Sequence, residues 1–146
     1  MKSPESFPGR CIVSPLVLLG PAARTVTGIG DEIELDGFEV LAFELDVTAA
    51  ATEVGDTLDV FVQTTVDGTT WVDIVHFTQI LGNGGAKRYF SKVAAAQALT
   101  EFENGAALAA ASVRHIPGSR YRVRWAITDS GTVNASFNFA VYANGT

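Results

Sequence analysis

Hydrophobic and polar side chains alternate along much of this 146-residue chain, most clearly between residues 57 and 77. A period of two is expected of a β-strand with two different faces. The first arm alternates one set, Leu58, Val60, Val62 and Thr64, with another, Asp59, Phe61, Gln63 and Thr65. Asp67 and Gly68 then form a turn signal, because glycine tolerates a positive φ angle and aspartate bonds its own backbone. After the turn the alternation resumes on Trp71, Val75 and Phe77. The stretch therefore predicts a β-hairpin.

Three further segments carry the same pattern of apolar residues. Segment 38–47 has Leu41, Phe43, Leu45 and Val47 on one face, and segment 120–128 has Tyr121, Val123, Trp125 and Ile127. Segment 133–141 has Val133, Ala135, Phe137, Phe139 and Val141, and the turn signal at 129–131 predicts that it pairs with 120–128 as a second hairpin. With weaker candidates the chain reaches about eight strands, separated by turns and without a long helix. This pattern predicts an all-β fold, an antiparallel β-sandwich or jelly-roll-like domain.

The pattern also predicts the domain organisation. We expect one β-sandwich domain over residues 20–146, preceded by an extended N-terminal arm at 1–19 that contains three of the prolines. An insertion at 94–114 stays open, because its alanine content favours a helix whereas the chain on either side favours strands. A loop or a β-arm suits this insertion equally well.

Composition and charge exclude several classes of protein. Hydrophobic residues make up 47% and charged residues 18%, which excludes a disordered chain. A formal net charge of −6 argues against a nucleic-acid partner, and no apolar run approaches the roughly 18 residues of a membrane span. The single cysteine, Cys11, cannot form an internal disulfide. We therefore expect neither nucleic acid nor membrane as a partner.

The most regular charged pattern is formed by Arg120, Arg122 and Arg124, which share one face of a predicted strand. Three guanidinium groups in this arrangement suit an anionic surface, including the acidic patch of a partner protein. The alternative that we favour at this point is structural, namely cross-strand pairing with the acidic residues Glu44, Asp46 or Asp59.

Other candidate sites are weaker. Five carboxylates on neighbouring predicted strands, Glu44, Asp46, Asp59, Asp67 and Asp73, lack the spacing of a calcium loop. His76 and His115 read as structural histidines, and the chain has no nucleophile elbow, phosphate loop or Cys-x-x-Cys motif. We expect no catalytic residue, no metal and no cofactor. Trp125 belongs to an apolar face and hence to the core, whereas Trp71 follows a turn and is a candidate for sugar stacking.

Two segments carry a resemblance to a known class of protein. Residues 58–79 (LDVFVQTTVDGTTWVDIVHFTQ) and 120–128 (RYRVRWAIT), the latter followed by the strand 133–141, resemble small β-sandwich proteins encoded among the head genes of tailed bacteriophages. With 38–47 the resemblance covers about residues 35–142. It implies a non-enzymatic virion structural protein of the capsid decoration (cement) type. The alanine-rich insertion and the N-terminal arm depart from the pattern.

The resemblance also implies partners and a location. A decoration protein is made in the host cytoplasm, sits on the capsid surface, and contacts the major capsid protein and sister subunits. Closed symmetry makes a homo-oligomer such as a trimer the expectation. We expect the arm to order against the lattice or a sister subunit by strand addition. The interaction residues are then the three arginines and the apolar arm residues Ile12, Val13, Leu16 and Val17. The alternatives are a head–tail connector or tail component, and a carbohydrate-binding β-sandwich with Trp71 and Tyr142 on one exposed platform.

Overall fold

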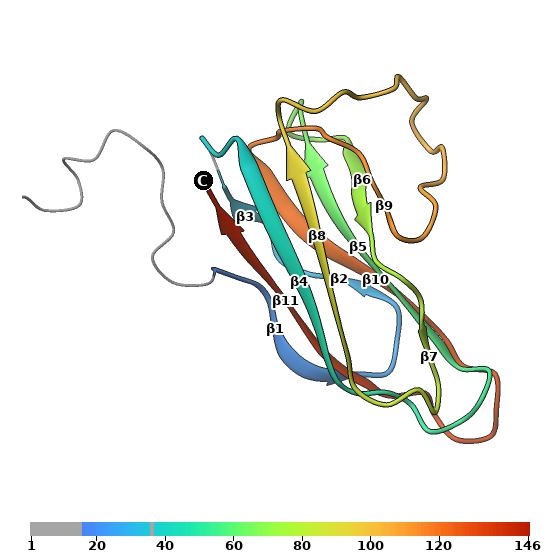
Figure 1. Cartoon of the computed structure of the whole chain (residues 1–146). Helices are drawn as coiled ribbons and strands as arrows, with labels where there is room; N and C mark the ends of the chain where they lie inside the picture. Colours follow the sequence, from blue (N-terminus) through green and yellow to red (C-terminus); the bar gives the residue numbers. More distant parts are fainter. Residues whose placement is uncertain (1–15, 36) are drawn as a thin grey trace, which may run out of the picture.

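Two antiparallel sheets pack face to face in the computed structural model, which describes residues 16–35 and 37–146 (Figure 1). The first sheet, sheet A, has the order β1 (Leu16–Arg24), β11 (Phe137–Gly145), β4 (Val40–Ala49), β8 (Lys87–Ala94). The second, sheet B, has the order β2 (Gly28–Ile29), β10 (Arg120–Thr128), β5 (Thr57–Thr65), β6 (Trp71–His76), β9 (Ser112–Val113). Two short strands complete sheet B, because β3 (Ile33–Glu34) pairs with β10 and β7 (Ile80–Leu81) pairs with β5. The predicted all-β antiparallel sandwich is confirmed.

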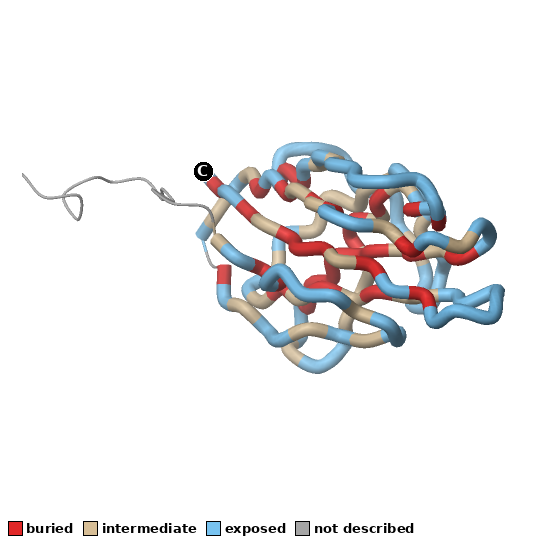
Figure 2. Tube along the Cα trace, turned by 90° about the horizontal axis from the view of Figure 1, so that it is seen from below, coloured by how far each residue is buried: buried red, intermediate tan, exposed pale blue. Residues whose placement is uncertain are grey.

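The core lies between the sheets, and Figure 2 marks its buried positions along the long strands in red. Sheet A contributes Phe43, Leu45, Phe137, Phe139 and Val141. Sheet B contributes Leu58, Val60, Val62, Ile74, Tyr121, Val123 and Trp125. Phe139 and Trp125 meet edge to face across the core, with ring centroids 6.0 Å apart. The alternation read from the sequence therefore corresponds to inner and outer faces, as expected for strands with one buried side.

Strand β5 departs from this rule and is buried on both faces. Its outer-face residues Phe61, Gln63 and Thr65 are only 8%, 7% and 1% exposed. Side chains of β6 and β10 cover them, together with the loop 95–111, which runs beside β6 in Figure 1. A polar side chain can be buried there only when its hydrogen-bonding groups are satisfied.

A bulge in β6 changes which side chains reach that outer face. The pairing of β5 with β6 shifts register between Val62 and Gln63, so Ile74 is an extra residue on β6. Ile74 and Val75 are consecutive and both buried in the core. Trp71 consequently lies on the outer face with Asp73, opposite Thr65, and not on the inner face with Val75 as the sequence pattern predicted.

The N-terminal boundary differs from the predicted one. Residues 16–19, expected in the arm, belong to β1 and pair with β11, where Leu18 and Leu19 are 3% and 8% exposed. Their burial against the core explains why they join the sheet. The strand runs through Pro21 because β1 is an edge strand with two register shifts, where a missing N–H leaves no ladder partner unsatisfied. The rest of the predicted arm, including Cys11, Ile12 and Val13, lies outside the described residues.

The structure also bears on the second predicted hairpin and on the alanine-rich insertion. Segments 120–128 and 137–145 do not form a hairpin, because β10 belongs to sheet B and β11 to sheet A, so the chain crosses between the sheets after residue 128. Of the insertion left open at 94–114, residues 95–111 form a loop between β8 and the short strand β9 (Ser112–Val113), and the described residues contain no helix. Besides one internal backbone bond, from Ala106 N to Glu103 O, the loop bonds to β6: Leu108 O meets the His76 ring, and Ala111 N donates to His76 O.

The two faces of sheet A give a direct test of the packing. Phe139 is fully buried and Phe90 is 74% exposed on the opposite face. Truncating Phe139 to alanine removes core contacts and opens a cavity, so we expect Phe139→Ala to lower the free energy of unfolding by about 3–5 kcal/mol. Phe90→Ala is the matched control, with an expected change within about 0.5 kcal/mol. Urea denaturation of both variants measures this, and similar losses would contradict the orientation of sheet A.

The hairpin turn between β5 and β6 predicts a dependence on pH. The main-chain N–H of Thr70, then that of Thr69 and the Thr70 hydroxyl, donate to the Asp67 carboxylate and hold its pKa well below its usual value. A depressed pKa in the folded state stabilises the fold above the unfolded pKa of about 3.9 and ceases to do so as the pH falls further.

We therefore expect Asp67→Asn to lower the melting temperature at pH 7, and the difference from wild type to shrink below about pH 4. Thermal melts from pH 2 to pH 7 measure it. Asp31→Asn is the control, because Asp31 is exposed and its carboxylate accepts no hydrogen bond from the described residues. A difference for Asp67→Asn that stays constant with pH would contradict the role of the charge.

Candidate functional site

A pocket of about 300 Å³ lies on the outer face of sheet B, between β5, β6 and β10 on one side and the loop 95–111 on the other. The strands contribute Gln63, Trp71, Val72, Asp73 and Arg124 to its wall. The loop and the residue just after β9 contribute Phe102, Asn104, Gly105, Ala106, Ala107 and Arg114. The volume is at the lower end of the roughly 300–1,000 Å³ typical of small-molecule sites. We call this cavity the sheet-B pocket.

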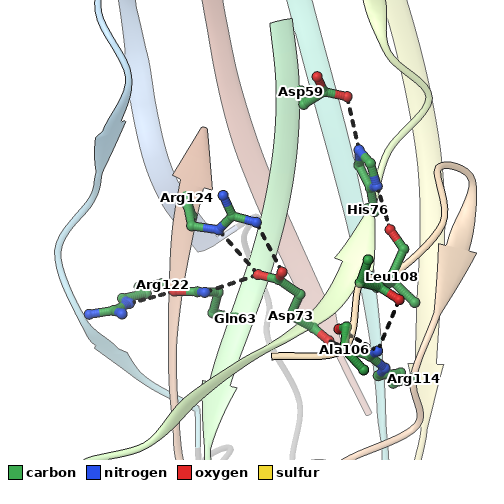
Figure 3. A network of polar contacts seen from close by, with 10 residues as sticks. Asp59, Gln63, Asp73, His76, Ala106, Leu108, Arg114, Arg122 and Arg124 are labelled. Carbon is green, nitrogen blue, oxygen red and sulfur yellow. Dashed lines mark hydrogen bonds and ion pairs between the residues drawn. The ribbon is translucent and has the colours of Figure 1, made fainter. Parts of the chain in front are cut away.

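Asp73 is the centre of a polar network at the base of the pocket (Figure 3). Arg124 binds it with both ends of the guanidinium, Nη2 to Oδ2 at 2.9 Å and Nε to Oδ1 at 3.3 Å. Gln63 donates from Nε2 to Asp73 Oδ1 at 2.9 Å, and its Oε1 accepts from Arg122 Nε at 2.8 Å. Both ends of the buried Gln63 amide are thereby satisfied. The network links β10, β5 and β6 across the outer face.

Arg122 uses only part of its hydrogen-bonding capacity. Its guanidinium packs over the ring of Trp71, with 4.1 Å from Cζ to the ring centroid, and Nε bonds Gln63. Its two terminal nitrogens donate to no group among the described residues, and no carboxylate of those residues lies within 4.0 Å. Partial burial lowers the pKa of Arg122 below its usual value, because desolvation disfavours the charged form. Arg122 is thus a partly desolvated cation with free donors.

Arg114 fastens the loop to the sheet. Its Nη1 donates to Asp73 O at 3.1 Å, and its Nη2 donates to Ala106 O at 2.9 Å and Ala107 O at 3.3 Å. The guanidinium lies over the ring of Phe102 at 3.8 Å. Within the described chain its partners are main-chain carbonyl groups and the aromatic ring, so its charge has no carboxylate counterion there.

The histidines have structural contacts. The His76 ring bonds Asp59 Oδ1 at 2.9 Å and Leu108 O at 2.8 Å, and it stacks on Phe61 with centroids 4.0 Å apart. His115 Nδ1 accepts from Ala94 N at 3.0 Å. These contacts join elements that are distant in sequence.

The three predicted arginines do share the outer face of β10, but only two of them reach the pocket network. Arg120 is separate, because it bonds Glu32 Oε1 at 3.1 Å and Gly68 O at 3.0 Å. The expected pairing with Glu44, Asp46 or Asp59 is wrong. Asp73 and Glu32 are the carboxylates that these arginines meet. Glu44 and Asp46 lie on the other sheet with Arg88, at 3.6 Å and 3.2 Å.

A second candidate surface is the outer face of sheet A. The strand registers place Val17 opposite Tyr142, Tyr142 opposite Glu44, and Glu44 opposite Phe90, so one row crosses all four strands. Val17 is 48% and Phe90 74% exposed. A hollow of about 220 Å³ lies in this row, between Tyr142 and Phe90. We call these four residues the sheet-A row. Leu16, predicted as an interaction residue with Val17, pairs with Ala143 and packs against the core.

Two of the alternative sites do not form. Trp71 belongs to sheet B and Tyr142 to sheet A, so one sugar platform cannot use both. The five carboxylates considered for calcium are divided between the outer faces of both sheets and the hairpin turn. A different trio, Glu53, Asp56 and Asp129, brings carboxylate oxygens within 4.8 Å of one another.

That trio has a structural explanation. Asp56 accepts from Ser130 N and Oγ, at 2.8 Å and 3.1 Å, and Asp129 accepts from Gly131 N at 3.2 Å. The two oxygens of Glu53 accept from the main-chain N–H groups of residues 132 and 133. Glu53 and Asp56 therefore bind the loop between β10 and β11 to the loop after β4, and Asp129 bonds within the first of these loops.

Comparison with known proteins adds no assignment, since no protein-family model and no curated protein matches the chain. Among the described residues there is no helix, and so none long and apolar enough to cross a membrane.

The Asp73 network predicts a measurable contribution to stability. Asp73→Ala leaves the Gln63 amide and the Arg124 guanidinium without their shared acceptor, so we expect the free energy of unfolding to fall by about 1–3 kcal/mol. Asp46→Ala is the matched control, because its partner Arg88 has a 64% exposed side chain and such surface pairs contribute about 0–1 kcal/mol. Urea denaturation compares the two, and equal losses would show that the network has no special role.

Proposed function

We propose that this protein is a non-enzymatic structural protein of a tailed-bacteriophage virion, which decorates and stabilises the capsid by binding the major capsid protein and sister subunits. The resemblance of segments 58–79 and 120–141 supports the class of protein. The sheet-A row is the observation that supports a binding role.

The sheet-A row has the character of a protein-binding surface. Large apolar side chains stand at both edges of the sheet, and Tyr142 lies between them. Aromatic anchors of this kind carry much of the energy of protein interfaces. Glu44, in the same row, pairs with Arg88 at 3.6 Å and adds a polar group that can fix the register of a partner.

The two edges of sheet A differ in their suitability for contacts with sister subunits. The β8 edge carries Lys87, Arg88 and Lys92, charged residues of the kind that discourage strand pairing. The β1 edge carries the apolar segment 16–19 and no charge before Arg24. We assign sister-subunit contacts to the β1 edge, where an added strand would bond the exposed backbone.

Co-sedimentation with empty capsids of the encoding phage tests the proposal. We expect the wild-type protein to bind saturably, in proportion to capsomers or to threefold positions. Phe90→Ser removes an exposed anchor and should weaken binding at least tenfold, the scale expected of an interface hot spot. Val66→Ser is the matched control, since Val66 is 77% exposed in the turn region after β5, on the other sheet, and should bind as wild type.

The outcomes are distinct. Wild-type binding with an unaffected Phe90→Ser variant would refute the sheet-A row as the docking surface. Failure of the wild-type protein to bind capsids would refute the decoration function, and a soluble ring of many subunits would instead favour a connector or tail component.

A further inference from the structure

We propose that the chain's own N-terminal segment docks on the outer face of sheet A, with Ile12 and Val13 in the hollow between Tyr142 and Phe90. These two apolar residues belong to segment 1–15, which lies outside the described residues. We call the hollow, of about 220 Å³, the sheet-A hollow. The docking concerns the free protein. Its consequence for capsid binding rests on the proposed function, because both use the sheet-A row.

The sheet-A hollow suits an aliphatic side chain. It is lined by Phe90 and Tyr142 together with the small residues Ala42, Ser91 and Ala143. Its volume is below the roughly 300–1,000 Å³ typical of small-molecule sites, so it fits side chains of a polypeptide better than a separate ligand. Phe90 is 74% exposed. Covering its ring with apolar side chains removes a large apolar surface from water, which is favourable.

The segment joins the domain at the rim of the hollow. Leu16, the first residue of β1, pairs with Ala143, which itself lines the hollow (Figure 1). Neighbouring strands are about 4.8 Å apart, so β8 with Phe90 lies roughly 14 Å across the sheet from β1. An extended chain spans up to about 3.5 Å per residue, so Val13 and Ile12, three and four residues before Leu16, can reach about 10–14 Å. The hollow lies within that reach.

The charges of the segment and of the hollow are complementary. Among the described residues that line the hollow, only Glu44 is charged. Its contact with Arg88, at 3.6 Å, is a weak surface pair, because the Arg88 side chain is 64% exposed. Segment 1–15 carries two cationic side chains and one acidic side chain. Arg10 stands two residues before Ile12, so docking brings a cation to Glu44.

An attached segment has an advantage over a separate partner. A segment joined by a short stretch of chain acts at an effective concentration on the order of mM. A second copy or a capsid protein must instead lose translational and rotational freedom to bind. We therefore assign the hollow of the free protein to the segment of the same chain. A capsid that binds the sheet-A row has to displace it.

Nuclear Overhauser effects in the full chain test the docking. In methyl-labelled protein, we expect cross-peaks from the methyl groups of Ile12 and Val13 to the ring protons of Phe90 and Tyr142. A sample of mixed labelled and unlabelled chains distinguishes contacts within one chain from contacts between two chains. We expect contacts within one chain.

A double variant assigns the effect to the two apolar residues. Ile12→Ser/Val13→Ser should lose the cross-peaks and shift the amide signals of Ala42 and Ser91. Val54→Ser is the matched control, because Val54 is 80% exposed in the loop at the other end of β4, and it should leave these signals unchanged. Unchanged circular dichroism would show that the double variant is folded. If it fails to fold, the cross-peaks of the wild-type protein decide the question.

Capsid binding tests the consequence for the proposed function. A docking surface that is free in only a fraction of the molecules loses apparent affinity by that fraction, so the double variant should bind empty capsids about twofold or more tightly than wild type. Weaker binding by the double variant would overturn this consequence, since the segment would then contribute to capsid binding and not compete with it.

The remaining outcomes separate the docking from the decoration function. The absence of cross-peaks from Ile12 and Val13 to either ring would overturn the docking. Cross-peaks only between two chains would also overturn it and make a second copy the occupant. Hollow signals that are identical in the wild-type protein and the double variant would have the same meaning. Cross-peaks within one chain, with no capsid binding by either protein, would support the docking and refute the decoration function.

Discussion

The buried amide of Gln63 is the constraint on which the outer face of sheet B depends. This side chain is 7% exposed on the face of a sheet that would ordinarily be solvated. Buried amide groups require partners at both ends, and here Arg122 supplies the donor and Asp73 the acceptor. Those two residues come from the strands on either side of β5, so satisfying one side chain fixes the outer-face arrangement of three strands.

The bulge in β6 makes this arrangement possible. Without the extra residue Ile74, Asp73 and His76 could not both lie on the outer face, because residues three apart on a regular strand point to opposite sides. With it, Asp73 meets Gln63 while His76 stacks on Phe61. The loop 95–111 then has acceptors and donors at fixed positions, and its bonds to His76 and Arg114 complete the pocket.

Whether a feature could be predicted from the sequence depends on how far apart along the chain its interacting residues lie. Alternation is local, so the faces of β5 and β10 and the turn at Asp67 could be predicted. The shared face of the three arginines on β10 could be predicted for the same reason. Their partners could not, because these depend on which strands flank β10 in the folded sheet. The crossing of the chain from β10 to β11 depends equally on strand order, and apolar alternation on both segments fits a hairpin as well as two facing sheets.

The sequence does contain a sign of the bulge, but a prediction based on strict alternation overlooks it. Ile74 and Val75 are adjacent apolar residues within an alternating strand, and such a doublet marks a place where the phase changes. Reading that doublet moves Trp71 from the core to the outer face. The sequence of the alanine-rich loop 95–111 contains no comparable sign of its conformation. That conformation depends on contacts with His76 and Arg114, which lie outside the loop.

The sheet-A row and the sheet-B pocket lie on opposite outer faces of the sandwich. The sheet-A row and the sheet-B pocket belong to different sheets with the hydrophobic core between them. A capsid bound at sheet A would leave sheet B directed away from the particle. The core between the sheets would then hold the sheet-B pocket on the side of the protein that faces away from the particle. Binding at one face need not alter the other, because within the described part of the chain no polar contact of the Asp73 network extends into sheet A.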